Sequence, residues 1–396
     1  MFEFVFTTGT EINMMQPATA VNPIFSPAFL RHPWTIYRNL RKHKLPCYFP
    51  QDGLCVLTQY TEVRNALTSH WVSSSPPTAC LHSVLGTTFR DVDGVGHQRL
   101  RHAFLAPYRR KTVDSLAPAI IDPVVENVIE GVVKNGGGDF VADVAYPLAI
   151  NVACRTIGIP ESDGPHLFHL TLKLMETMGE GAVLDETFNE IRGYFLELLQ
   201  GNPCPNTLLA HLTTQDVINK DDVVRNLILI FAASTKPMAA GISNTFLSVA
   251  QHPKAYGAAY RQPQALRAAI NESLRLETPL DLITRYAKQD QIINGYNIRE
   301  GTLLLLALAS GHRDETVYRN ANEWNPKRDT QKNLAFGLGH HVCLGRYLAM
   351  ALLMRSVSAL FQRVDGLRLT ADTDLTISNP FVRIPKHLDL AISSYQ

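Results

Sequence analysis

The strongest constraint on this chain is the segment of residues 336–345, which reads F-G-L-G-H-H-V-C-L-G and leads into an apolar run at 347–360. The spacing of that run predicts a helix. Glycines allow backbone conformations that other residues resist, and they let a bulky ligand approach closely. Cys343 lies at the entrance of the predicted helix, where the positive helix end stabilises a thiolate. The segment therefore predicts a loop that presents one cysteine to a ligand.

A single cysteine before an apolar helix is ordinarily a small buried hydrophobic residue, but the residues around Cys343 argue against that. The pattern F-G-x-G-x-H-x-C-x-G resembles the cysteine loop of the cytochrome P450 family in its soluble bacterial form, and the resemblance runs from about residue 45 to the C-terminus. It implies that the protein binds haem b (iron protoporphyrin IX) with Cys343 as the metal ligand. A thiolate bound to haem iron favours O–O cleavage. The haem contacts that it implies are Cys343, Phe336, Gly337 and Gly345, with His97, Arg101, Arg285 and His341 toward the propionates.

Composition limits the other classes of function. Lys and Arg number 37 against 36 Asp and Glu, so the net charge of +1 creates no overall field for nucleic acid or an anionic membrane. The first residues lack the basic start of a signal peptide, no uncharged apolar run approaches ~18 residues, and the six cysteines show no paired spacing. We expect a monomeric cytoplasmic protein, without nucleic-acid or membrane partners, in which residues 1–396 form one domain with an irregular segment at about 1–30.

The hydrophobic pattern predicts a mostly α fold with small β portions, which agrees with the single large haem-enclosing domain that the resemblance implies. The predicted helices cover 61–67, 97–107, 113–135, 140–157, 164–179, 185–200, 221–251, 263–277 and 344–362. The predicted strands are a hairpin at 46–57, the segments 282–287, 291–293, 296–298 and 303–306, and ribbons beyond 367.

Glu272 and Arg275 lie three residues apart on one face of a predicted helix. By itself such a pair is a surface ion pair worth a few tenths of a kcal/mol. Ahead of the cysteine loop it resembles the E-x-x-R element of the family, whose pair joins a further arginine, and Arg328 is the candidate here. The implied role is structural, because these residues would hold the cysteine loop in place.

A cluster of basic side chains follows His97 in this otherwise neutral chain. In the family the corresponding helix borders the face on which an acidic ferredoxin docks, so the resemblance implies a ferredoxin and its reductase as electron donors. Complementary charge would speed that encounter. A basic helix that is merely solvated explains the cluster equally well. The cluster consists of Arg99, Arg101, His102, Arg109, Arg110 and Lys111.

The predicted helix at 221–251 departs from the family pattern where an acid and a threonine usually deliver protons. Lys236 stands at the position of the acid and Pro237 at that of the threonine. Proline removes a helical donor, and a lysine in an apolar pocket needs an anion or must lose its proton. Lys236 could instead extend outward along its stem. A local bulge could also shift the register and make Ser234 or Thr235 the hydroxyl.

The leading interpretation is a haem-thiolate monooxygenase that oxidises a small, largely apolar metabolite in specialised metabolism, with dioxygen and ferredoxin electrons. The departures at Lys236 and Pro237 leave two other reactions open: peroxide-driven oxidation of an anionic substrate, or oxidation without oxygen insertion, such as aromatic coupling or rearrangement. The arrangement of Lys236 and Pro237 is similar to the Arg-Pro pair of the fatty-acid peroxygenase branch, in which a substrate carboxylate supplies the missing acid. A haem-binding protein without turnover is a further alternative. The resemblance places the substrate pocket at Phe231, Ala232, Leu282, Ile283, Phe381 and Val382.

Overall fold

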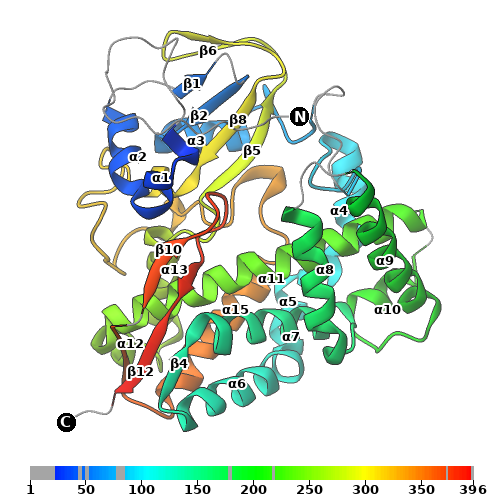
Figure 1. The fold of residues 1–396 in the computed structure, drawn as a ribbon, viewed down its shortest axis with the longest axis vertical. Coiled ribbons are helices and arrows are strands. Elements are labelled where there is room, and N and C mark those ends of the chain that lie inside the picture. The colour runs from blue at the N-terminus through cyan, green and yellow to red at the C-terminus, as the bar shows by residue number, and fades with distance from the viewer. Residues whose placement is uncertain are drawn as a thin grey trace.

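The computed structural model describes residues 23–42, 47–49, 53–76, 85–176, 181–215, 219–371 and 373–393. A large helical region adjoins a smaller β-rich region, which lies at the top of Figure 1. The helices are α1 (Pro27–Arg31), α2 (Pro33–Lys42), α3 (Tyr60–Thr68), α4 (Gly94–Leu105), α5 (Arg110–Ile120), α6 (Asp122–Lys134), α7 (Tyr146–Ile157), α8 (Gly164–Glu176), α9 (Gly181–Gln200), α10 (Leu208–Leu212), α11 (Lys220–Gln251), α12 (Pro253–Ala259), α13 (Pro263–Leu276), α14 (Leu308–His312) and α15 (Arg346–Phe361). The strands are β1 (Cys47–Phe49), β2 (Leu54–Leu57), β3 (Val72–Ser73), β4 (Gly137–Asp139), β5 (Leu282–Ala287), β6 (Gln291–Ile293), β7 (Tyr296–Ile298), β8 (Leu303–Ala307), β9 (Gly366–Leu369), β10 (Asp374–Ile377), β11 (Pro385–His387) and β12 (Asp389–Ser393).

The β-rich region is built on a five-stranded sheet with the order β1-β2-β8-β5-β3. β2 and β8 are parallel, with Leu54 opposite Leu303, whereas the other neighbours are antiparallel. Residues from α1 and α2 pack against this sheet, and Phe29 and Tyr37 are fully buried there. The expectation of an irregular segment at 1–30 is therefore wrong for residues 23–30, whose apolar side chains form part of a core; residues 1–22 lie outside the described residues.

Helix α11 organises the helical region. It begins where the Asn219 side chain accepts the Asp222 N–H, and it packs against α7, α8, α9, α13 and α15. Figure 1 shows it crossing the middle of the molecule. Two segments, Phe140–Ile157 and Lys220–Gln251, are long and apolar enough to cross a membrane, but they are 67% and 61% buried inside the protein. Their apolar character is accounted for by their place in the core.

The predicted elements agree with the structure in type and fail in detail where proline or short length intervenes. The helix predicted at 113–135 is two helices, α5 and α6, because Pro123 starts the second one and cannot continue the hydrogen bonding of the first. The helix predicted at 140–157 begins with a π-helical turn at Phe140–Ala145. Helices α10, α12 and α14 were not predicted, since five to seven residues show too little periodicity.

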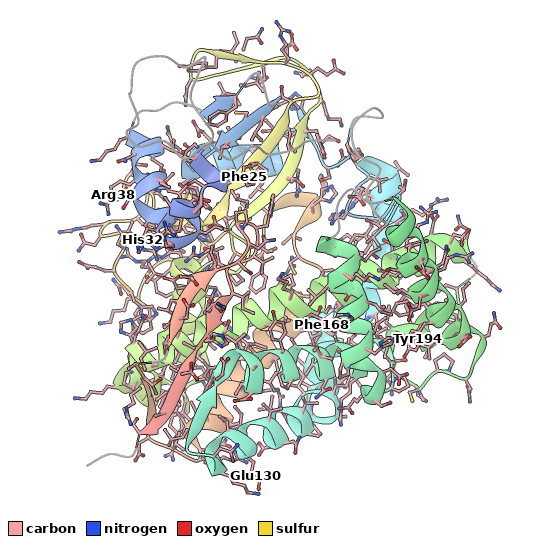
Figure 2. All side chains as sticks on the ribbon, in the orientation of Figure 1. Phe25, His32, Arg38, Glu130, Phe168 and Tyr194 are labelled. Carbon is pink, nitrogen blue, oxygen red and sulfur yellow. The ribbon has the colours of Figure 1, made fainter. Side chains whose placement is uncertain are left out.

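Side chains fill the spaces between the ribbons, as Figure 2 shows. The largest apolar cluster joins α4 to α11, α13 and α15, and two smaller clusters lie under the five-stranded sheet and α3. Charged side chains such as Arg38 and Glu130 lie at the periphery. Helix α15, which follows the cysteine loop, packs against α11, so the fold brings together two segments that are about one hundred residues apart in sequence.

Candidate active site

The cysteine loop is fixed by backbone hydrogen bonds. The N–H of Cys343 donates to the Phe336 carbonyl at 2.8 Å, and the N–H of Gly337 donates to the Leu334 carbonyl at 2.8 Å. Gly337 and Gly339 have φ values of +68° and +70°, which favour glycine. A Cβ on Gly339 would also lie 2.9 Å from the Leu67 carbonyl oxygen. Backbone conformation therefore requires glycine at two of these positions, as expected.

Gly345 has a different reason to be glycine. Its φ is −85°, so the expectation that it too needs an unusual backbone conformation is wrong. A Cβ at this position would meet nothing within 4 Å among the described residues. Open space beside Gly345 at the start of α15 is consistent with close approach by a bulky ligand, which is the other reason for a glycine there.

The Cys343 side chain is exposed. Burial raises the pKa of its thiol, while the Gly345 N–H, Arg101 and Arg346 act to lower it. Protein atoms near the sulfur thus act on the thiol, while the side chain still offers surface to a ligand. Arg101 and Arg346 favour the thiolate, and a bound cation would offset the free-energy cost of burying its charge.

Arg101 and His97 connect α4 to the cysteine loop. The Nη2 of Arg101 donates to the Val342 carbonyl at 2.6 Å. The two ring nitrogens of His97 lie 2.7 Å from the Phe89 carbonyl and 3.1 Å from that of His340. Both nitrogens therefore have backbone partners, and the expected role of His97 toward a propionate stays a prediction.

The His341 ring lies against that of His97 at a tilt of 52°, with ring centroids 4.1 Å apart, and its Nε2 lies 2.9 Å from Asp93 Oδ1. Burial lowers the pKa of His341 to about 4, against the opposing effect of Asp93. Sequence analysis missed Asp93. Its only signal was an Asp before a predicted helix, the position of an N-cap residue.

Arg285 lies close to His341 and Asp93. The charge of Arg285 lowers the pKa of His341, and the charge of Asp93 raises that of Arg285. Its Nη1 donates to the Thr284 carbonyl at 2.7 Å, and burial lowers its pKa. Arg101 and Arg285 each use one nitrogen in the hydrogen bonds that the structure describes, and an arginine carries five N–H donors. The further N–H donors of these two arginines beside the loop therefore suit a ligand with carboxylates.

The middle of α11 carries the residues at which the sequence departs from the family pattern. Ala233 is exposed although its helix runs through the core, and Lys236 and Pro237, one turn further on, are partly exposed. Pro237 has no N–H, so the Ala233 carbonyl lacks its usual helical donor. The helix nevertheless continues from Lys220 to Gln251 without a bulge at this point.

The alternative register that makes Thr235 the reactive hydroxyl is not supported. Thr235 is 1% exposed, and its hydroxyl donates to the Ala232 carbonyl at 3.1 Å within the same helix. Its side chain thus lies on the packed side of α11 rather than on the side where Ala233 is exposed. The catalytic role predicted for Thr235 is corrected on this ground, whereas the roles of Lys236 and Pro237 stay predictions.

The expected pocket residues divide into two groups. Phe231 is 0% and Leu282 is 2% exposed, and both belong to packed apolar clusters, so neither offers surface to a substrate. These two expectations are wrong, because Phe231 lies on the packed side of α11 and Leu282 on the packed face of β5. The four partly exposed members, Ala232, Ile283, Phe381 and Val382, remain candidates. An isolated β-bridge joins Leu280, just before the strand that carries Ile283, to Val382. Ile283 is therefore near Phe381 and Val382.

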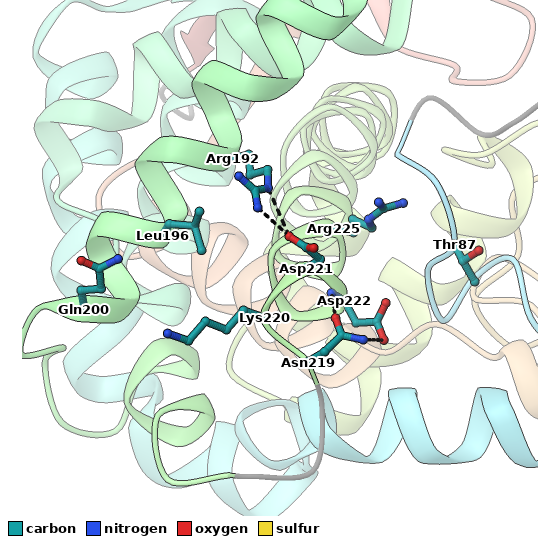
Figure 3. Close-up of a pocket in the computed structure, with 9 residues that line it drawn as sticks. All are labelled: Thr87, Arg192, Leu196, Gln200, Asn219, Lys220, Asp221, Asp222 and Arg225. Carbon is teal, nitrogen blue, oxygen red and sulfur yellow. Dashed lines mark hydrogen bonds and ion pairs between the residues drawn. The ribbon is translucent and has the colours of Figure 1, made fainter.

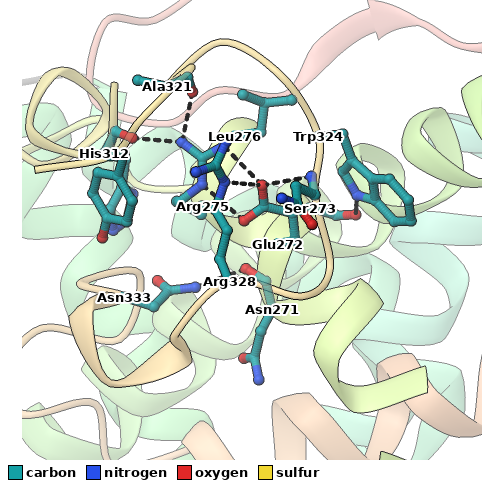
Figure 4. A network of polar contacts seen from close by, with 12 residues as sticks. Asn271, Glu272, Ser273, Arg275, Leu276, His312, Ala321, Trp324, Arg328 and Asn333 are labelled. Atoms are coloured by element: carbon teal, nitrogen blue, oxygen red, sulfur yellow. Dashed lines mark hydrogen bonds and ion pairs between the residues drawn. The ribbon is translucent and has the colours of Figure 1, made fainter. Parts of the chain in front are cut away.

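The Glu272, Arg275 and Arg328 side chains meet in one buried cluster (Figure 4). Arg275 Nε and Nη2 donate to the two oxygens of Glu272 at 2.8 and 2.9 Å, and Arg328 Nε donates to Glu272 Oε1 at 3.0 Å. The remaining N–H groups of Arg275 donate to the carbonyls of His312, Ala321 and Glu323. The cluster thereby ties α13 to the segment that leads into the cysteine loop.

A separate polar recess of about 690 Å³ lies at the start of α11 and is shown in Figure 3. Arg192 pairs with Asp221 inside it at 2.8 Å. Ala233 is thirteen residues further along the helix, or about 20 Å at the α-helical rise. The recess is therefore distinct from the cysteine site. Its lining residues are Thr87, Arg192, Leu196, Gln200, Asn219, Lys220, Asp221, Asp222 and Arg225.

Comparison with known proteins agrees with this geometry. The family model described as cytochrome P450 matches residues 182–391. The 20-oxo-5-O-mycaminosyltylactone 23-monooxygenase of Streptomyces fradiae is 30% identical over 289 residues, which cover 71% of this chain and 68% of that protein. The chain belongs to the cytochrome P450 family, whose members bind haem, and it is an oxidoreductase of the P450 monooxygenase type.

Two further likenesses support the assignment. The biotin biosynthesis cytochrome P450 of Bacillus subtilis (strain 168) is 29% identical over 284 residues, which cover 69% of this chain and 72% of that protein. The crystal structure of P450BioI with an acyl carrier protein that carries hexadec-9Z-enoic acid superposes with a TM-score of 0.82 at 26% identity, covering 92% of this chain and all of that one. The fold class predicted from the sequence is confirmed.

Proposed function

We propose that this protein uses haem held through Cys343 to oxidise a small, largely apolar metabolite of specialised metabolism in the cytoplasm. The observation that carries the proposal is the exposed Cys343 side chain, set in a loop fixed by the Phe336 carbonyl. Haem with a thiolate ligand supplies activation of dioxygen. The substrate itself is set by the pocket rather than by the fold.

The chain's own residues would divide the remaining work. Arg101 and Arg285 would bind the haem carboxylates, because they are half-buried cations with further N–H donors beside the loop. Ala232, Ile283, Phe381 and Val382 would orient an apolar substrate and exclude water from it. The Ala233 carbonyl, which lacks a donor from Pro237, would accept a hydrogen bond from a water or from a substrate hydroxyl.

Replacement of Cys343 by alanine tests the proposal. The reduced, carbon-monoxide-bound wild type should show the red-shifted Soret band of thiolate ligation, and Cys343→Ala should lose it. Cys204→Ala is the matched control, because Cys204 is also exposed but lies outside the loop. An unchanged band in Cys343→Ala would mean that another residue holds the iron.

A second candidate reaction follows from Lys236 and Pro237, which replace the acid and threonine of the family. If Lys236 binds an anionic substrate, peroxide could serve as oxidant, or the reaction could be a coupling or rearrangement without oxygen insertion. Lys236→Met keeps the apolar stem and removes the charge. Weaker substrate binding in Lys236→Met would support the anion contact, whereas unchanged binding and turnover would show that Lys236 points away from the substrate.

The double variant Lys236→Glu with Pro237→Thr restores the family pattern and separates the two reactions. Improved hydroxylation would indicate a monooxygenase limited by proton delivery. Unchanged or abolished product would favour coupling, rearrangement or peroxide use. A protein that binds haem but turns over no substrate under either regime would support the remaining alternative, a haem protein without catalysis.

We also propose that electrons arrive from a ferredoxin and its reductase at the basic surface around α4 and α5, and that the enzyme works as a monomer. Arg99, Arg109 and Arg110 are exposed on this surface. Arg346, at the start of α15, stacks on the Tyr347 ring at 4.7 Å, and Arg110 is near enough for its charge to act on Tyr347. An acidic partner would thus approach the side of the molecule on which the cysteine loop lies.

A further inference from the structure

Asp281 is a buried residue directly before β5, and its backbone joins two segments that carry candidate pocket residues. Its N–H donates to the Phe381 carbonyl at 2.9 Å, and Ile283 lies two residues further along the chain. The neighbouring Leu280 forms the β-bridge to Val382. A movement of the segment around Phe381 relative to Asp281 would therefore reach side chains that we assign to the substrate pocket.

The Asp281 side chain lies among buried polar groups that are incompletely paired. Its Oδ1 accepts the Tyr37 hydroxyl at 2.6 Å, whereas its Oδ2 is fully enclosed and has no hydrogen-bond partner among the described residues. The same holds for Nε and Nη1 of Arg383, and this Nη1 lies 3.8 Å from Asp281 Oδ2. Buried opposite charges are ordinarily hydrogen-bonded, because each unpaired atom costs free energy. A displacement of about 1 Å would bring the two groups to hydrogen-bond distance.

The charge of Asp281 itself changes within the ordinary pH range. Burial raises the pKa of Asp281 to about 6, Glu277 adds to the rise, and Arg383, the Tyr37 hydrogen bond and Arg313 act against it. Ionisation near pH 6 therefore turns on a strong attraction between the carboxylate and Arg383. The titratable and charged groups around Asp281 come from four parts of the chain: Tyr37 and Arg41 on α2, Glu277 after α13, Arg313 after α14, and Arg383 between β10 and β11.

The segment that carries Arg383 lies between two apolar clusters. Phe381 packs against the cluster under the five-stranded sheet, to which Tyr37 also belongs, whereas Val382 packs against the large helical cluster. The Arg383 N–H donates to the Pro279 carbonyl at 2.9 Å, so the backbone of this segment follows the chain before Asp281. Movement of Arg383 toward Asp281 therefore draws Val382 away from the helical cluster.

We propose that Asp281 is a positioning residue for the substrate pocket: its ionised carboxylate draws Arg383 into a hydrogen bond, and the shift of Val382 enlarges the space between this segment and the helical cluster. In the protonated form the separation of 3.8 Å persists and the space stays narrow. Asp281 acts through Arg383 and touches no substrate. The inference rests on the proposed function, because it takes Val382 as part of the pocket.

The affinity of the haem-loaded protein for tert-butyl isocyanide tests the proposal, because this bulky apolar ligand of haem iron carries no titrating group. In the wild type the affinity should rise about three- to tenfold between pH 5 and pH 7.5, since a coupling of one pKa unit corresponds to about tenfold. The midpoint should lie near pH 6. Asp281→Asn keeps an oxygen for the Tyr37 hydroxyl and removes the charge, so its affinity should stay at the low-pH value. A wild-type affinity that ignores pH would overturn the proposal.

Two further variants separate positioning from general packing. Arg383→Gln removes the cation that Asp281 attracts, and it should also abolish the pH dependence. Asp114→Asn changes an exposed carboxylate on α5 and should follow the wild type. A pH dependence that survives in Asp281→Asn or in Arg383→Gln would assign the titration to another group and would overturn the proposal.

Hydrogen exchange gives a readout that does not depend on the isocyanide. The amides of Asp281 and Arg383 donate to the carbonyls of Phe381 and Pro279, so they report how closely the two segments are held. At pH 7.5 they should exchange more slowly in the wild type than in Asp281→Asn, and equal rates would overturn the proposal. Failure of the proposed function would show as a missing thiolate band in the wild type. Failure of this inference alone leaves that band intact and the isocyanide affinity independent of Asp281.

Discussion

Two buried clusters of charge stabilise this protein, and they satisfy their polar atoms to different degrees. In the Glu272 cluster (Glu272, Arg275 and Arg328), all five N–H donors of Arg275 have partners. In the Asp281 cluster (Tyr37, Asp281, Arg313 and Arg383), four buried nitrogen or oxygen atoms have none among the described residues. The closest approach of Arg383 Nη1 to Asp281 Oδ2 is 3.8 Å, an ion pair without a hydrogen bond.

The difference relates to what each cluster joins. The Glu272 cluster fixes α13 to the segment before the cysteine loop, and a fully satisfied network specifies one geometry. The Asp281 cluster fixes α2 to the start of β5 and to the segment around Arg383, and the guanidinium groups of Arg313 and Arg383 lie 3.6 and 4.3 Å from the Trp34 ring. Burial raises the pKa of Asp281 to about 6, against the opposing effect of Arg383 and the hydrogen bond from Tyr37. The ionised form of Asp281 is therefore poorly stabilised near neutral pH.

The largest expected effect is at the Glu272 cluster. Glu272→Ala leaves Arg275 as an uncompensated buried cation, which should cost about 3–5 kcal/mol of unfolding free energy. Haem content should fall with it, because the loop that presents Cys343 loses its support. Urea unfolding and the absorbance ratio of haem to protein measure both effects. Glu323→Ala is the control, since this neighbour contributes to the cluster only through its backbone carbonyl. A stable, fully loaded Glu272→Ala would remove the distinction between the clusters.

The contrast between the clusters also marks how far sequence reasoning reaches. Glu272, Arg275 and Arg328 could be predicted because their spacing matches a recognisable pattern. The Asp281 cluster could not, because its members come from four separate segments, and only the tertiary fold brings Tyr37 within 2.6 Å of Asp281. The same limit explains Asp93, whose importance lies in the side chains that it contacts across the chain.

The predicted site fared similarly. The cysteine loop and the helix after it follow from local pattern, and long periodic helices such as α11 were located closely. The errors at Phe231, Leu282 and Thr235 share one cause, because sequence distance along an element does not state which side of it meets the open site. A one-residue step moves a side chain by 100° on a helix and to the opposite face on a strand.

An intermediate effect is expected at Asp281, with a sign set by pH. The folded-state pKa of about 6 exceeds the ordinary value of 3.8, so the folded protein holds a proton that the unfolded chain releases. The stability contributed by this proton is present below pH ~4 and is lost as pH rises through ~6. Relative to Asp281→Asn, the wild type should thus lose on the order of 3 kcal/mol between pH 4 and pH 7.

Urea unfolding of the wild type and Asp281→Asn at the two pH values measures this difference. Asp114→Asn is the control, because its carboxylate is exposed and makes a surface ion pair with Arg110 across 3.6 Å. A parallel pH dependence in the wild type and Asp281→Asn would mean that the cluster stabilises the carboxylate as well as the Glu272 cluster does. The comparison of the two clusters would then fail.

A smaller effect should follow from Arg328→Lys, which keeps the charge in the Glu272 cluster. Arg328 donates to Glu272 and also to the carbonyls of Arg319 and Asn320 at 2.7 and 2.8 Å. A lysine cannot reproduce this planar fork, so we expect a loss of about 1–2 kcal/mol in unfolding free energy. Arg319→Lys, at an exposed neighbour, is the control and should change little. A loss as large as that of Glu272→Ala would mean that Arg328, rather than Glu272, carries the cluster.

The smallest effect on stability is expected on the exposed basic surface, where Arg109→Glu with Arg110→Glu reverses two charges. Arg110 makes a surface ion pair of 3.6 Å with Asp114, and such pairs contribute about 0–1 kcal/mol. Unfolding free energy should therefore change by less than about 1 kcal/mol, in contrast to the buried clusters. Reduction by a ferredoxin should nevertheless slow, and its rate should depend less steeply on salt, because the two cations no longer attract an acidic partner. Substrate affinity serves as the internal control and should stay constant. A reduction rate that ignores both the mutations and the salt would place the docking face elsewhere or point to peroxide as the oxidant.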